Sequence, residues 1–153
     1  MAKTRIVEAA PPAAEMANAP TQARRFVAAR RRRAAETLED YTELIADLIA
    51  CDGEARITEI AERLGVAHPT AIKAIGRLER EGLAIVKPYR GVSLTDAGRT
   101  MAEQVRRRHR LVADFLIAVG APHEAAEADA EGIEHYGSSA TLAAFEAFLA
   151  GRK

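Results

Sequence analysis

Residues 57–94 read ITEIAERLGVAHPTAIKAIGRLEREGLAIVKPYRGVSL, and this stretch decides the fold. Apolar residues recur first at helical spacing and then in short runs typical of strands, and Gly65 and Gly82 interrupt the pattern. The spacing predicts two helices followed by two strands, over 57–64, 68–81, 83–86 and 92–94. A helix-turn-helix followed by a β-hairpin is a winged helix, a motif that places its second helix in the major groove of DNA.

Helices are predicted on both sides of this winged helix, so the fold class is mainly α. Before it, a basic segment compatible with a helix begins at Thr21, and apolar spacing predicts a helix over roughly 37–51. After it, three helices are predicted, beginning near Thr95, Pro122 and Ser138 or Ser139. The expected organisation is a disordered tail (1–20), a basic helical extension with the winged helix (21–95), and an all-helical domain (96–150) that binds metal and dimerises.

The composition indicates a reducing compartment, and the charged residues are distributed unevenly along the sequence. Cys51 is the lone cysteine, so no disulfide framework or zinc ribbon is expected, and the expected location is the cytoplasm. No signal peptide or membrane span is expected. Residues 37–52 carry five acids and no base, and 119–137 are also acidic, whereas 1–36 and 53–118 are net basic. The neutral total therefore does not exclude DNA binding, because a basic surface can be local.

Six side chains with the chemistry of metal ligands lie in three separate predicted helices. They are Asp40 and Glu43 in the first, His109 in the second, and Glu131, Glu134 and His135 in the third. Residues three or four apart share a helix face, so each group can present its ligands together. Four carboxylates and two imidazoles form a hard donor set that suits Mn²⁺ or Fe²⁺ rather than zinc or copper, with one or two ions per chain.

Each group alone also has a simpler interpretation. Asp40 and Glu43 alone suit a solvated acidic face, and His109 alone suits a hydrogen-bonded core histidine. Together they predict a switch, because crowded carboxylates repel one another until dications bind between them. Such ions would tie the helix before the winged helix to the helix around residues 131–135, and would favour one placement of the two domains.

The second helix of the motif and the hairpin supply the candidate DNA contacts. Early residues of a recognition helix meet base edges, and a wing tip meets phosphate. The candidates are Pro69, Thr70, Lys73 and Arg77 in the helix and Lys87 and Arg90 at the wing tip. Aromatic residues are few, which argues against stacking on single-stranded nucleic acid. For the arginine run at 30–33, a solvated helix face and a phosphate-binding arm both stay open.

Five strings resemble one known family, the diphtheria toxin repressor family of metal-dependent regulators. The strings are LEDYTELIADLI (38–49), IAERLGVAHPTAIKAIGRLEREGL (60–83), YRGVSLTDAG (89–98), RRHRLVADFL (107–116) and DAEGIEHY (129–136). Within the family, the similarity is to the manganese-responsive branch, because iron-responsive relatives carry a cysteine in place of Glu131. Close relatives often carry a second histidine in place of Tyr136, so we expect tuning of the site there.

The resemblance implies that the six residues above ligate metal, and it implies a homodimer. It also implies palindromic operators and Mn²⁺-dependent repression of manganese uptake genes, with no enzymatic activity. Three alternatives remain: a winged-helix regulator that responds to Fe²⁺ or to no metal, a dinuclear metallohydrolase, and an interaction module with acidic partner-binding surfaces. Binding of double-stranded DNA, compared across Mn²⁺, Fe²⁺, Co²⁺, Zn²⁺ and chelator, separates the manganese-dependent repressor from these alternatives.

Overall fold

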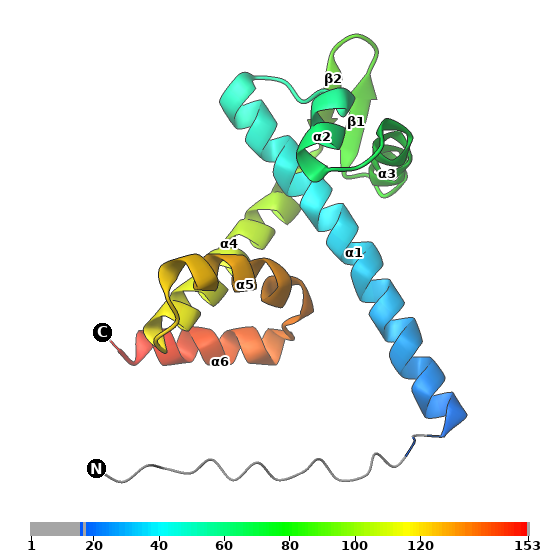
Figure 1. Ribbon diagram of the computed structural model, residues 1–153. Helices are drawn as coiled ribbons and strands as arrows, with labels where there is room; N and C mark the ends of the chain where they lie inside the picture. The colour runs from blue at the N-terminus through cyan, green and yellow to red at the C-terminus, as the bar shows by residue number, and fades with distance from the viewer. Residues whose placement is uncertain (1–15, 17, 153) are drawn as a thin grey trace, which may run out of the picture.

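The structure, a computed structural model, describes Met16 and residues 18–152. Its first element, α1 (Ala19–Asp52), is one helix of 34 residues, much longer than the predicted helix at 37–51 (Figure 1). No glycine or proline interrupts the sequence from Thr21 to the end of α1, and alanine and arginine are good helix formers. The basic extension and the predicted helix are therefore continuous. Most of the predicted tail at 1–20 lies outside the described residues.

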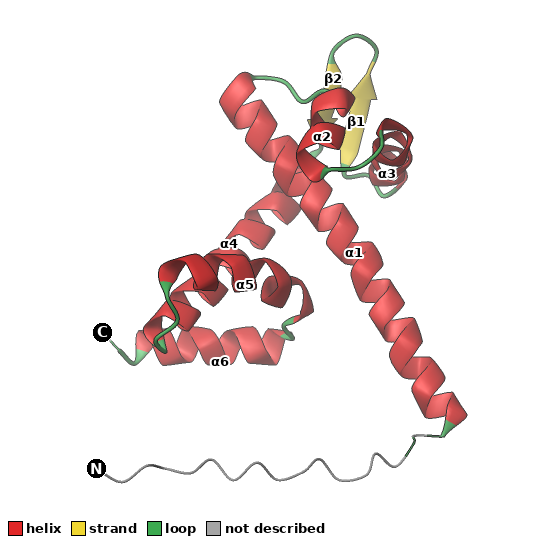
Figure 2. Cartoon of the chain, in the orientation of Figure 1, coloured by secondary structure: helices red, strands yellow, loops and turns green. Residues whose placement is uncertain are grey.

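The winged helix forms as predicted, with strand ends that differ by one residue. α2 (Ile57–Leu64) and α3 (His68–Arg80) are followed by an antiparallel hairpin of β1 (Ala84–Lys87) and β2 (Gly91–Leu94). Figure 2 shows the hairpin beside these two helices, at the C-terminal half of α1. Buried side chains from these elements form one core, among them Ile45, Ile60, Ile75, Leu78 and Val92. Burial of each contributes about 1.5–3 kcal/mol.

The second domain is helical, with α4 (Asp96–Ala118), α5 (His123–Tyr136) and α6 (Ser139–Ala150). The hydroxyl of Thr95 caps α4 by accepting from the Gly98 N–H at 3.1 Å. Gly98 is required at this point, because a Cβ there would collide with the backbone carbonyl of Leu83 at the start of the hairpin. Gly98 and Ala102 face the core, and Ala97 is exposed.

The core of this second domain is small. Only Val112, Ala113 and Ala130 form its buried apolar cluster, and Phe115 stacks on Phe145 with ring centroids 3.9 Å apart. No side chain of α6 is buried, although this helix is strongly apolar. A core of this size is marginal alone, which is the physical reason to expect dimerisation through these helices. Across the described residues, no helix is long and apolar enough to cross a bilayer.

Candidate functional site

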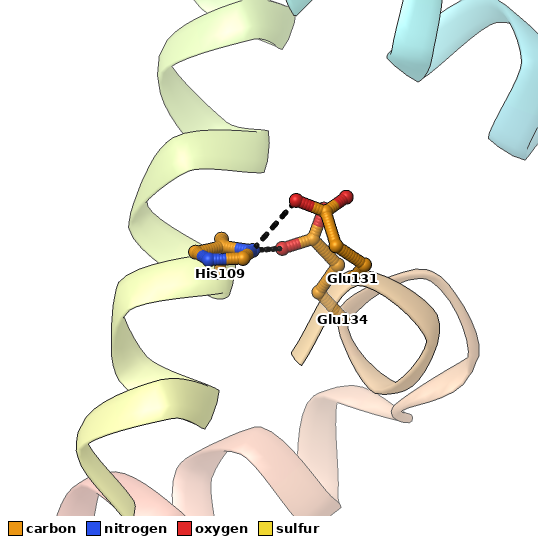
Figure 3. Close-up of side chains that lie close together, drawn as sticks. All are labelled: His109, Glu131 and Glu134. Atoms are coloured by element: carbon orange, nitrogen blue, oxygen red, sulfur yellow. Dashed lines mark ion pairs between the residues drawn. The ribbon is translucent and has the colours of Figure 1, made fainter. Parts of the chain in front are cut away.

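α4 and α5 bring three of the predicted ligands into contact (Figure 3). His109 points from α4 toward α5, with its Nδ1 3.0 Å from Glu134 Oε2 and 3.6 Å from Glu131 Oε1. One ligand atom from each of these three residues lies within 4.8 Å of the other two. The apolar phase of α4 turns His109 inward, because its neighbours one turn away, Val105 and Val112, are buried.

α1 brings the remaining carboxylates to the same place. His135 Nε2 lies 3.2 Å from Asp40 Oδ1 and 3.4 Å from Glu134 Oε1, so α1 and α5 meet at this histidine. Asp40, Glu43 and Glu131 line one cavity of about 370 Å³. The structure thus gathers all six predicted residues from three helices at one position, between the helix that packs on the winged helix and the second domain.

Glu134 is the residue that most requires a cation. Its side chain is 1% exposed, and neither carboxylate oxygen has a hydrogen-bond partner with suitable geometry, despite the close approach of both histidines. Burial raises the pKa of Glu134 to about 7, although the two histidine charges pull it back. A buried carboxylate without a hydrogen bond is unfavourable unless it is protonated or bound to an ion. The oxygen-rich donor set around it fits Mn²⁺ or Fe²⁺.

Burial also raises the pKa of Asp40 and Glu43. For Asp40, His135 lowers the pKa and the nearby carboxylates raise it further. For Glu43, the charges of Asp47 and Glu131 raise the pKa further. For His109, burial alone would lower the pKa, but the hydrogen bond to Glu127 and the surrounding carboxylates outweigh burial and raise it. These raised pKa values favour the protonated forms in the metal-free protein, so protons compete with a cation for the site.

The metal-free protein is therefore expected to lose stability as pH rises. Glu134 has a pKa of about 7 in the folded state and 4.5 as its usual value, so its contribution is complete below about pH 4.5 and is lost as pH rises through about 7. The effect is on the order of 3–4 kcal/mol at most, at about 1.4 kcal/mol per pKa unit. Thermal melting with chelator, from pH 5 to 8, measures it. We expect Glu134→Gln to flatten the profile relative to the exposed Glu124→Gln, and a melting temperature that rises with pH would contradict the assignment.

The candidate DNA contacts lie on exposed parts of α3 and the wing. Pro69, Thr70 and Lys73 are exposed and Arg77 is half-buried, while Ala71, Ile75 and Leu78 fill the core side of α3. Lys87 and Arg90 are exposed at the two ends of the hairpin turn. The buried stripe of α3 therefore orients the predicted side chains outward, which a groove-reading helix requires.

Comparison with known proteins identifies the family. Residues 34–92 match the family model "Iron dependent repressor, N-terminal DNA binding domain", and residues 95–153 match "Iron dependent repressor, metal binding and dimerisation domain". The transcriptional regulator MntR of Escherichia coli O6:H1 is 48% identical over 113 residues, which cover 74% of this chain and 73% of that protein. The chain belongs to the diphtheria toxin repressor family, in its MntR branch.

More distant members of the MntR branch and solved structures support the same family assignment. The regulator MntR of Bacillus subtilis is 39% identical over 101 residues, covering 65% of this chain and 70% of that protein. A manganese-dependent transcriptional repressor solved with manganese is 33% identical, with a TM-score of 0.63, covering 72% of this chain. The match spans about half of that solved chain, 51%. These relatives are regulators of transcription, which sets the metallohydrolase alternative aside.

Two carboxylates that sequence reasoning missed hold the histidines of this MntR-branch site. Glu39 Oε2 lies 2.7 Å from His135 Nδ1, and Glu127 Oε2 lies 2.8 Å from His109 Nε2. Each contact leaves the other ring nitrogen facing the cluster, an arrangement that fixes the orientation of a metal-binding histidine. One signal was available in the sequence: Glu127 precedes Glu131 by four residues and so shares its face of α5. Glu39 offered the same signal, because it precedes Glu43 by four residues on α1.

Arg108 of α4 adds a charge beside Glu39. Its Nη2 lies 2.7 Å from Glu39 Oε1, an ion pair whose angles do not suit a hydrogen bond, so Nε and Nη2 of Arg108 have no hydrogen-bond acceptor. Tyr136, where the resemblance suggested tuning of the site, donates its hydroxyl to Glu36 Oε2 at 2.7 Å. That contact raises the pKa of Tyr136. Tyr136 therefore belongs to the contact between α5 and α1 rather than to the ligand cluster.

Removing either carboxylate that holds a histidine is expected to weaken metal binding without abolishing it. Glu39→Gln and Glu127→Gln keep the size of each side chain but remove the charge that favours the proton on the outer ring nitrogen. Substitution of such partners typically costs about 10- to 100-fold in metal affinity. Titration of Mn²⁺ followed by EPR measures the loss. Glu103→Gln, on an exposed position of α4, is the matched control, and unchanged affinity in both test variants would rule out the positioning role.

Proposed function

We propose that this chain is a manganese-dependent transcriptional repressor that binds palindromic operator DNA as a homodimer in the bacterial cytoplasm and controls manganese uptake genes. One observation carries the proposal: a buried carboxylate, Glu134, lies without a hydrogen bond beside His109, His135 and Glu131. Sulfur is absent from this set, which favours Mn²⁺ over softer ions. The match to MntR regulators and to a manganese-bound repressor supports it.

The position of the six residues supplies the switch. Asp40 and Glu43 lie on α1, whose following turns pack in the core of the winged helix through Ile45 and Leu48. The other four lie on α4 and α5, in the half of the chain that matches the dimerisation model. When bound, Mn²⁺ supplies the positive charge that these carboxylates lack. The six side chains then hold α1 in one position relative to α5, and so hold each winged helix in one position within the dimer.

Linkage makes the coupling reciprocal. If metal favours the dimer geometry that fits two operator half-sites, operator DNA must raise the metal affinity by the same factor. Two winged helices related by a two-fold axis match a palindrome, because the half-site spacing mirrors the symmetry of the protein. Metal affinity measured with and without operator DNA therefore reports on the switch directly.

The deciding experiment is capture of sheared genomic DNA by the purified full chain, in parallel with Mn²⁺, Fe²⁺, Co²⁺, Zn²⁺ and chelator. The proposal predicts enrichment of a few promoter fragments containing a palindrome, most strongly with Mn²⁺. Strongest enrichment with Fe²⁺ would establish the iron-responsive alternative. Enrichment with chelator equal to that with Mn²⁺ would establish a regulator without this switch. If no fragment is enriched and EPR shows no Mn²⁺ binding, the chain is an interaction module.

A further inference from the structure

The N-terminal half of α1, residues 19–36, forms a basic arm that the metal site and the winged helix leave unexplained. No side chain of the arm is buried, whereas the half of α1 that follows contributes five buried residues to the protein. Figure 1 shows the arm projecting as a helix beyond the body of the molecule. Its positive charges are Arg24, Arg25 and Arg30–Arg33, all exposed, and Glu36 at its end is its one acid.

The charges of the arm surround the helix instead of marking one face. Successive helical residues are rotated by about 100°, so Arg30–Arg33 point to all sides of the axis. Among the described residues, none of the six arginines forms a salt bridge with a carboxylate. A flat acidic protein surface would contact only one side of such a helix. A helix in a groove of duplex DNA, in contrast, has phosphates on both of its sides. Arginine is also the side chain best suited to phosphate.

The arm is rigidly joined to the metal site. Asp40 and Glu43 lie on the same uninterrupted helix, about two to five turns from the arginines. Three contacts fasten this stretch of α1 to α5: the Tyr136 hydroxyl donates to Glu36 at 2.7 Å, His135 Nδ1 lies 2.7 Å from Glu39, and His135 Nε2 lies 3.2 Å from Asp40. Whatever fixes α1 against α5 therefore also fixes the direction of the arm.

We propose that the basic arm is a second DNA contact, which binds the phosphates of duplex DNA outside the reach of the recognition helix and wing. The inference rests on the proposed DNA-binding function. From Arg24 to Arg33 the helix rises about 14 Å, which is the length of about four phosphates along one strand. The arm recognises no base sequence, so it strengthens binding to every duplex. Because proposed metal ligands lie on the same helix, bound metal would fix the orientation of the arm as well as that of the winged helix.

The test compares the salt dependence of DNA binding in full-length variants. Arg30→Gln/Arg31→Gln/Arg32→Gln/Arg33→Gln removes four charges and keeps good helix formers, and the fourfold Arg→Lys variant keeps both charge and helix. Binding of the Mn²⁺-loaded proteins to a mixed-sequence DNA duplex is measured over a range of salt concentrations. Each phosphate contact contributes about 0.9 to the slope of log K against log[salt], so four glutamines should reduce the slope by up to about 3.6 per chain.

We expect the lysine variant to keep the slope of the unmodified protein and the glutamine variant to lose both slope and affinity. Arg107→Gln/Arg110→Gln, two exposed positions on α4, should leave the slope unchanged. Circular dichroism and Mn²⁺ titration without DNA verify that the glutamine variant folds and binds metal. An unchanged slope in a folded glutamine variant would overturn the proposal. Dissociation of the glutamine variant into monomers on sedimentation would also overturn it, because the arm would then contact the partner subunit instead of DNA. If the unmodified protein itself binds no duplex, the proposed function fails first and the arm with it.

Discussion

Glu134→Gln is expected to abolish the response of DNA binding to Mn²⁺. The substitution keeps the shape of a side chain that is 1% exposed and removes the charge at the centre of the ligand cluster. A ligand at the centre should matter more than the partners that orient His109 and His135, whose loss costs about 10- to 100-fold, so we expect a loss of metal affinity above about 100-fold. Fluorescence anisotropy with a captured promoter fragment, with and without Mn²⁺, measures the response.

The same substitution is expected to stabilise the metal-free protein at neutral pH. Glu134 has no hydrogen-bond partner in the fold, and burial disfavours its charged form, so a neutral amide removes a cost that the carboxylate imposes. A variant that melts higher without metal and no longer responds to metal separates the loss of a ligand from a folding defect. Glu124→Gln, exposed on the same helix, is the matched control. A metal response equal to that of the unmodified protein would refute the ligand assignment.

Lys73→Ala/Arg77→Ala is expected to lower operator affinity strongly while leaving metal binding intact. Both side chains emerge from the outward side of α3, and each contact to a guanine edge is worth about 1–3 kcal/mol. The pair should therefore cost about 2–6 kcal/mol if both meet bases. The loss should also be larger for the promoter fragment than for a mixed-sequence duplex, because base contacts carry specificity and phosphate contacts do not.

Arg110→Ala, an exposed arginine on α4, controls for the general effect of removing positive charge. Competition between the promoter fragment and mixed-sequence DNA gives the specificity ratio for each variant. Equal losses on both duplexes would show that Lys73 and Arg77 contact phosphate only, and no loss would remove α3 from the DNA interface. Mn²⁺ titration without DNA should be unchanged, since neither residue is near the ligand cluster.

The elements with strong local signals were predicted well. Ala71, Ile75 and Leu78 repeat at helical spacing and form the buried side of α3, and Thr95 caps α4 as its sequence predicts. Asp40, Glu43, His109, Glu131, Glu134 and His135 converge, because helical spacing fixed the face that each presents. Their role as ligands stays a prediction, as do the domain boundaries. The length of α1 was underestimated, because apolar spacing stops where the basic arm begins although helix propensity continues.

The sequence by itself determined the winged helix, the helical second domain and the hard character of the donor set, since these depend on residue types and on spacings within single elements. Only the tertiary structure decided which neighbours complete the site. Glu39 and His135 are distant in the chain and meet because α1 packs beside α5, and His109 meets Glu127 because α4 packs on α5. The burial of Glu134 without a hydrogen bond is also a tertiary property, because burial depends on all the helices around a side chain. Local periodicity selects the face of a helix, whereas packing selects what that face meets.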